Sequence, residues 1–531
     1  RNSIGGSLNV VSKRPSETLE GEVRGTVESL GFWIGEGYLS GPIADGLKAR
    51  VSVQVGPRFF DEPYTNVSGL KGEGTLDRFL VEGQLEWDIS DSTELWLKYS
   101  HAEWDDHNRT GGLATAFSTT DVLAEGLVPN AAFGYGVASP GVTDPRSFDA
   151  NTRASQKLTD NHNIVAHLTA DMGGVTLKYV GGYSQYFYEQ ISDLDFTSVD
   201  SVTTGAGTLA ALSPAYGVFA YTYNPTYVQQ YIEDKSYYSN EITLSNSDEG
   251  AFNWIVGLYQ YHEDFSQPIT QFVDGDGSDN LSAAMVAPLC TGPGGAVAAS
   301  CAANPRRAIY EGRSNLEING LAAFGQADLE VADGLTVTVG LRYSRDEKKG
   351  DESFRLVGWD PTDPSASCFG FGCGAFTPAL DVTVPVLNTV FPGLTGSGAQ
   401  TRSFDDDWGG LSWRLGAEYS PNPDTLIFGS YSRGLKSGGF NLGVYSANAV
   451  VDKEEVDAFE IGLKSRPAHN VTFNATAFHY VYDGLQVPVE VETGGIGLGN
   501  LFNIPTSKST GVEFETAWEP TDWFELNANY A

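Results

Sequence analysis

The sequence is poor in basic residues and has no long hydrophobic run. Its 32 Lys and Arg stand against 68 Asp and Glu, a formal net charge of −36. Phosphate binding needs clustered Lys and Arg, so the composition excludes a nucleic-acid partner. The acidic surplus is compatible with a solvated, self-repelling surface and with cation binding by acidic loops. No segment reaches the roughly 18 to 25 apolar residues of a transmembrane helix, so any membrane crossing must use a closed β-barrel.

Motifs of catalytic chemistry are missing as well. We find no nucleophile elbow, no P-loop and no HExxH motif, which favours a protein that is not an enzyme and needs no cofactor or bound metal. Glycine and aromatic residues are plentiful instead, with 62 Gly, 25 Tyr and 28 Phe among 531 residues. This length exceeds one ordinary soluble domain and fits either several domains or one large closed architecture.

Apolar and polar residues alternate along many segments, with the period of two that is typical of a half-apolar strand. In residues 47–55 the odd positions are Leu, Ala and Val, and the even positions are Lys, Arg, Ser and Gln. Residues 79–87, 335–343 and 471–477 repeat the pattern. Runs of about nine residues are long enough for a tilted strand to cross a bilayer.

The connections between about seventeen such strands alternate between short and long. The short ones are rich in Gly, Pro, Asp and Asn and comprise residues 41–46, 88–93, 171–174, 246–251, 331–334, 420–424, 466–470 and 519–522. The long ones comprise residues 57–76, 102–160, 187–235, 263–314, 346–406, 434–455 and 483–507. This alternation predicts an all-β, antiparallel transmembrane barrel with turns on one rim and long loops on the other. A multi-domain soluble β-protein is the alternative, but loops of this length count against it.

All four cysteines lie in two of the predicted loops. Cys290 and Cys301 bound one short segment, and Cys368 and Cys373 bound another. Each pair is close enough in sequence to form a local disulfide on the extracellular side, where disulfides persist. Zinc binding is the alternative, although no His lies within either spacing.

Several segments resemble, in order along nearly the whole chain, the TonB-dependent outer-membrane receptors. The opening IGGSLNVVSKRP is similar to the last strand of their plug domain, and YLSGPIADGLKARVSV to the hairpin by which the chain enters the barrel. FNWIVGLYQYHED, LIFGSYSRGLKSGGFN and STGVEFETAW follow in the expected order. The resemblance implies a plug end at residues 1–17 and a barrel over residues 18–531.

The family forms plugged barrels of about 22 strands, so the resemblance implies a fragment that lacks most of the plug and about five strands. It implies a bacterial outer-membrane protein that imports a scarce ligand, energised by TonB through a part of the plug that is absent from the chain. Ferric siderophores are the first candidate ligands, ahead of cobalamin, saccharides and aromatic compounds. A porin or adhesin that works without TonB is the alternative of another class.

Candidate site residues follow from the residue patterns and from the resemblance to the receptor family. Aromatic residues of two loops are candidates to stack on a ligand, namely Tyr186, Tyr188, Tyr221 and Tyr223. Arg433 and Lys436 are candidates to contact an anionic ligand or a lipopolysaccharide phosphate, or else to stay solvated beside glycines that shape a loop. In the plug segment, Gly5 and Gly6 would allow close backbone packing, while Lys13 and Arg14 would pair with acidic side chains of the barrel wall.

Overall fold

The computed structural model describes most of the predicted barrel and part of its loops. The described residues are 11–28, 32–59, 65–69, 76–107, 147–193, 202–204, 221–223, 227–247, 250–273, 308–358, 380–381, 383–388, 391–396, 398–443, 445–493 and 496–531. Among them, no helix has the length and apolar character needed to cross a membrane.

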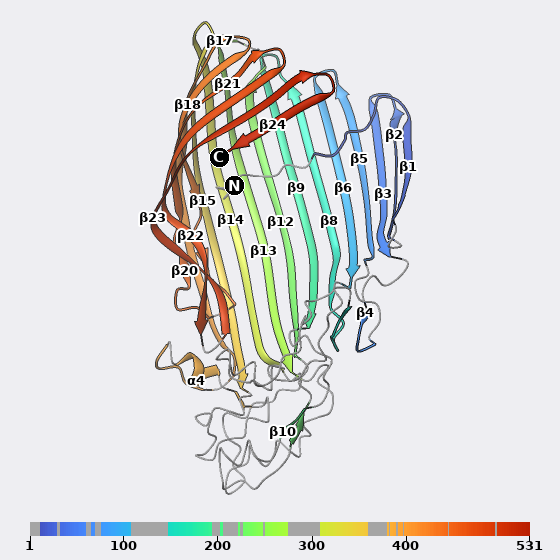
Figure 1. Cartoon of the computed structure of the whole chain (residues 1–531), viewed down its shortest axis with the longest axis vertical. Helices are drawn as coiled ribbons and strands as arrows, with labels where there is room; N and C mark the ends of the chain where they lie inside the picture. The colour runs from blue at the N-terminus through green and yellow to red at the C-terminus, as the bar shows by residue number, and fades with distance from the viewer. Residues whose placement is uncertain are drawn as a thin grey trace.

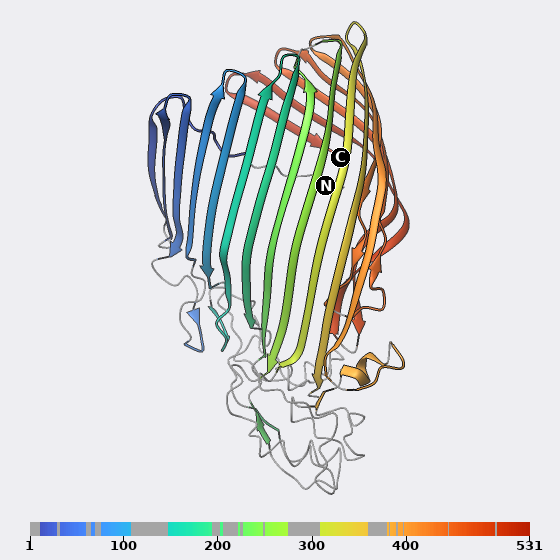
Figure 2. The ribbon, with the colours of Figure 1, turned by 180° about the vertical axis from the view of Figure 1, so that it is seen from behind.

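Within the described residues, seventeen main strands form one antiparallel sheet, in which each strand pairs with the next along the chain. They are β1 (Glu20–Val27), β2 (Phe32–Ala44), β3 (Leu47–Phe59), β5 (Arg78–Ser90), β6 (Thr93–Asp106), β8 (Ser155–Asp171), β9 (Val175–Asp193), β12 (Tyr227–Asn246), β13 (Phe252–Val273), β14 (Ala308–Ala332), β15 (Leu335–Gly358), β17 (Gln400–Asn422), β18 (Thr425–Lys436), β21 (Glu454–Ala468), β22 (Val471–Thr493), β23 (Ile496–Thr521) and β24 (Phe524–Tyr530). The strands stand side by side in a strongly curved wall (Figures 1 and 2).

Short elements lie in the long connections. They are β4 (Thr65–Asn66), β7 (Ser147–Phe148), β10 (Val202–Thr204), β11 (Tyr221–Tyr223), β16 (Leu380–Asp381), β19 (Gly439–Phe440), β20 (Val450–Val451) and the helix α4 (Thr383–Leu387). The two-residue strand β16 joins the main sheet beside β15, while the other short strands pair with one another.

The eight predicted turns are confirmed, because each joins two neighbouring strands of the sheet. All of them lie at one end of the wall, which we call the turn rim and which is uppermost in Figure 1. The opposite end, which carries the long connections, is the loop rim. In the turn between β14 and β15, Gly334 has a φ of +68°, a left-handed conformation that glycine adopts without strain.

The predicted loops are too long in several places. Residues 483–507 are mostly strand instead, because β22 runs to Thr493, β23 starts at Ile496 and the two pair along this stretch. Likewise β15 extends to Gly358 and β17 begins at Gln400, well inside the predicted loop of residues 346–406. The reason is physical: beyond the bilayer both faces of a strand are wet, so the sequence no longer has to alternate.

The two faces of the wall differ as the alternation predicts. The outer face carries exposed apolar side chains in its turn-rim half, such as Leu341, Leu415 and Ile461. On β15 this apolar face runs from Leu335 to Tyr343 and is followed on the same side by Arg345 and charged residues. The nine-residue length matches the crossing of a bilayer by a tilted strand. We therefore place the membrane-spanning part of the wall between the turn rim and the level of Tyr343.

Aromatic residues pack together inside the barrel near the loop rim. Tyr310, Phe354, Leu387 and Tyr445 form a buried cluster contributed by two strands, α4 and the connection that follows β18. The phenol of Tyr310 donates a hydrogen bond to the carbonyl of Gly443, with 2.6 Å between the oxygens. These contacts fold the β18–β21 connection inward against β14 and β15.

Candidate functional site

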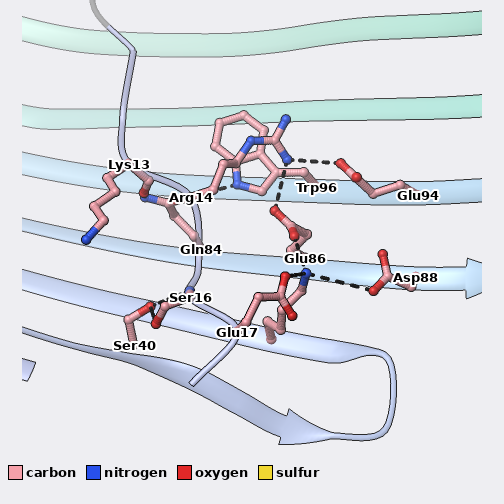
Figure 3. A network of polar contacts seen from close by, with 11 residues as sticks. Lys13, Arg14, Ser16, Glu17, Ser40, Gln84, Glu86, Asp88, Glu94 and Trp96 are labelled. Carbon is pink, nitrogen blue, oxygen red and sulfur yellow. Dashed lines mark hydrogen bonds and ion pairs between the residues drawn. The ribbon is translucent and has the colours of Figure 1, made fainter. Parts of the chain in front are cut away.

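The N-terminal described segment, residues 11–17, lies on the inner face of β2, β3, β5 and β6 (Figure 3). Alternation explains why this face is polar: the odd positions of β5, such as Leu85, face outward, so the even positions face the segment. The backbone carbonyl of Lys13 accepts a hydrogen bond from Gln84 at 3.1 Å. Ser16 binds the hydroxyl of Ser40 through both its amide and its own hydroxyl.

Charged groups hold the segment in place. Arg14 contacts the carboxylates of Glu86 at 3.3 Å and Glu94 at 3.2 Å, and its guanidinium lies 4.3 Å from the ring centre of Trp96. Lys48 bridges Glu86 at 2.6 Å and Glu17 of the segment at 2.7 Å. Glu86 is thus shared between a cation of the segment and a cation of the wall. We call the contacts of residues 11–17 with the wall the clasp.

Lys13 has a weaker place in the clasp than Arg14. Its ammonium pairs with Glu20 at 3.0 Å, and 65% of the Lys13 side chain is exposed. An ion pair this open to water contributes little free energy. The clasp therefore depends chiefly on Arg14, Glu86 and Lys48.

Tyr186 and Tyr188 lie in strand β9 rather than in a loop, and they face the barrel interior near the loop rim. The hydroxyl of Tyr186 donates to Glu233 of β12 at 2.9 Å, and Tyr231 donates to the other oxygen of the same carboxylate. Tyr188 stands edge-on to Tyr231, with 6.2 Å between ring centres. The two predicted tyrosines thus share one inward surface with an acidic residue that the sequence did not single out.

Arg433 and Lys436 are not brought together. Arg433 faces outward, where its guanidinium forms two hydrogen bonds with Asp457 of β21 and lies 4.7 Å from the ring centre of Trp413. Tyr431 also donates to Asp457 and stacks on exposed Phe459. Lys436 ends β18 three positions later, opposite Glu454 in the register with β21. An odd spacing of three residues places the two cations on opposite faces.

The remaining candidates have only partial descriptions. Tyr221 and Tyr223 lie in β11, where they pair with Thr204 and Val202 of β10, and their side chains are outside the described part of the chain. Gly5, Gly6 and the cysteines Cys290, Cys301, Cys368 and Cys373 lie outside the described residues.

The structure adds functional candidates that sequence reasoning missed. Glu86 and Trp96 were visible only as members of alternating strands, without any sign of what they face. No sequence pattern singled out Glu352 of β15. In the structure this residue is 1% exposed, receives a hydrogen bond from the amide of Tyr445 at 3.0 Å and pairs with Arg402. Pairings between such distant positions leave no local pattern in one sequence.

The apolar outer band, the polar inner face and the turn and loop rims define a β-barrel of the bacterial outer membrane. The family model described as "TonB dependent receptor-like, beta-barrel" matches residues 83–531. The chain therefore belongs to the TonB-dependent receptor family. No curated protein sequence matches it significantly.

Solved structures of low sequence identity share the fold. The ferric yersiniabactin uptake receptor FyuA from Yersinia pestis superposes with a TM-score of 0.62 at 14% identity, over 98% of this chain and 61% of that one. The siderophore receptor PiuA from Acinetobacter baumannii gives 0.56 at 16%, over 96% and 63%. The copper transporter OprC gives 0.52 at 11%, over 97% and 61%. This chain thus spans less than two thirds of these proteins' length.

Proposed function

We propose that the chain is the barrel of a TonB-dependent importer that takes up a scarce ligand across the outer membrane, with a ferric siderophore as the first candidate. Residues 1–17 are the end of the plug, and residues 18–531 belong to the barrel. The supporting observation is the clasp: a non-strand segment runs over the inner face of the wall and is held there by Arg14 and Glu17. A segment bound inside the lumen is what a plugged barrel requires, and an open porin has no need of it.

In this proposal the two ends of the lumen have different tasks. Aromatic and polar side chains near the loop rim, including Tyr186 and Tyr188, receive the ligand. TonB, acting on the plug of the intact receptor from the side of the turn rim, moves the plug so that the ligand passes. The steps are binding and movement, with no bond made or broken in the ligand.

Uptake by cells tests the proposal directly. A strain with the receptor gene deleted is grown under iron limitation, and radiolabelled iron is supplied in single purified siderophores. Uptake should be lost on deletion, return with the gene, and stay absent when TonB is removed. A barrel that restores uptake equally well without TonB is a porin, and unchanged uptake of every ferric complex rejects the siderophore as ligand.

A further inference from the structure

On the inward surface near the loop rim, hydrogen-bond acceptors outnumber the donors that are free to bind a ligand. It is formed by a set of side chains on β9, β12 and β13 that we call the tyrosine–glutamate cluster, namely Tyr186, Tyr231, Glu233, Lys235, Tyr261 and Glu263. In the registers of these strands they all fall on the face opposite the exposed apolar residues Ile242 and Leu258. The cluster therefore faces the lumen, at the level where the outer face has already become polar.

The phenol donors of the cluster are already used within it. Tyr186 and Tyr231 both donate to Glu233, and Tyr261 donates to Glu263. A tyrosine has a single hydroxyl proton, so none of these three phenols can also donate to a ligand. The ammonium of Lys235 is held 3.1 Å from Glu263.

The phenols of Tyr186 and Tyr231 stay protonated at neutral pH. Burial, followed by the hydrogen bond to Glu233, raises the pKa of Tyr186, and the same causes raise the pKa of Tyr231. Both groups lie beyond the membrane-spanning part of β9 and β12, which ends near Tyr183. Apart from the remaining N–H groups of Lys235, what the cluster offers to the lumen is therefore the spare lone pairs of carboxylate and phenol oxygens.

The net charge of the cluster also favours a cationic ligand over an anionic one. Two carboxylates face one ammonium, and Glu263 is only 8% exposed. Aromatic rings border the carboxylates, including Tyr188 beside Tyr231. Ring faces attract cations, and the effect grows where water is displaced. An anionic ligand would meet two carboxylates there and find the three phenol protons taken.

We propose that the tyrosine–glutamate cluster binds the cationic ammonium group of a ligand. The inference rests on the proposed import function and narrows its ligand from ferric siderophores in general to those that carry a free amino group. Glu233 supplies the counter-charge, and the tyrosines hold the carboxylate in position and supply ring faces.

Two ferric complexes that differ in one charge test this. Ferrioxamine B is a ferric trihydroxamate with one free ammonium group, and its N-acetylated form has the same iron centre without that charge. Binding to the purified receptor in detergent is followed by quenching of intrinsic fluorescence. We expect ferrioxamine B to bind about tenfold more tightly than the acetylated form, the effect of one charge-assisted hydrogen bond. Equal binding of the two, or no binding of ferrioxamine B, overturns the inference.

Matched variants locate the effect. E233Q should abolish the preference for ferrioxamine B, and E263Q should weaken it. Glu189 provides the control: it neighbours Tyr188 on β9 but faces outward, where Gln230 donates to it at 2.6 Å. E189Q should keep the full preference. A preference that survives both E233Q and E263Q, with the barrel still folded by heat-modifiable gel mobility, places the ammonium elsewhere and refutes the assignment.

Binding and uptake fail independently. A receptor that binds ferrioxamine B through Glu233 but shows no TonB-dependent uptake upholds the cluster and rejects the proposed import. A receptor that imports a triply negative ferric tricatecholate in a TonB-dependent way, unaffected by E233Q, upholds import and rejects the cluster as the ligand's ammonium site.

Discussion

Replacing Arg14 with glutamine should loosen residues 11–17 from the barrel wall without unfolding the barrel. The exposed pair with Glu94 contributes about 0.2 to 1 kcal/mol, and the stacking on Trp96 about 0.5 to 1 kcal/mol. The pair with Glu86 adds a similar amount, because Lys48 remains to compensate that carboxylate. We expect a loss of about 2 kcal/mol, or about thirtyfold faster amide hydrogen exchange in the segment.

Two further variants allow the contacts of the clasp to be ranked by their effect on hydrogen exchange. E86Q removes the carboxylate shared by Arg14 and Lys48, but Lys48 keeps its contact with Glu17 of the segment at 2.7 Å. Its cost to the bound segment should therefore be about 1 kcal/mol, smaller than that of R14Q. K13Q breaks only an exposed pair and should stay within about 0.5 kcal/mol of the wild type. Hydrogen exchange read by mass spectrometry on peptides covering residues 11–17 measures all three. Unchanged exchange in R14Q, or a larger effect in K13Q than in E86Q, would refute the role assigned to the clasp.

Three predictions concern the loops near the loop rim, and proteolysis within residues 437–453 measures each. E352Q leaves Arg402 uncompensated and weakens the bond from the Tyr445 amide, so the closed connection should be destabilised by about 3 kcal/mol and cleaved faster. Unchanged cleavage would contradict this role of Glu352. G438A places a methyl group against the Trp408 ring and should speed cleavage by forcing the two apart. Burial raises the pKa of Tyr310, so its stabilising bond is present below pH 10 and is lost as the pH rises through that higher pKa; Y310F should remove this alkaline dependence.

The turn rim could be predicted almost residue by residue from the sequence. Turns such as the one at Gly334 need glycine, proline, asparagine or aspartate for their backbone angles, and these residues are recognisable wherever they stand. The membrane-spanning strands were equally clear, because an outward charge in lipid costs about 2 to 4 kcal/mol and the alternation is enforced. These two constraints explain why the sequence correctly predicts the number and order of the strands and the side that each membrane-spanning residue faces.

The loop rim could not be predicted in the same way. Above the bilayer neither face of a strand has to be apolar, so the continuation of β15 to Gly358 carried no period of two. Arg433 looked like a free rim cation because its partner Asp457 stands on another strand, 24 residues away. Register decides such pairings, and register depends on the whole sheet rather than on the neighbours of one residue.

The charges of the clasp explain why a segment would return to the wall after being displaced. The wall side of the clasp holds Glu20, Glu82, Glu86, Asp88 and Glu94 against Lys48, Arg50 and Lys98. Among these contacts the segment contributes two cations, Lys13 and Arg14, and one acid, Glu17. When the segment leaves, carboxylates of β5 and β6 lose a cation within a lumen that screens them less than bulk water does. The uncompensated wall therefore attracts the segment back, so in the proposed import cycle no second force is needed to restore the segment after its displacement.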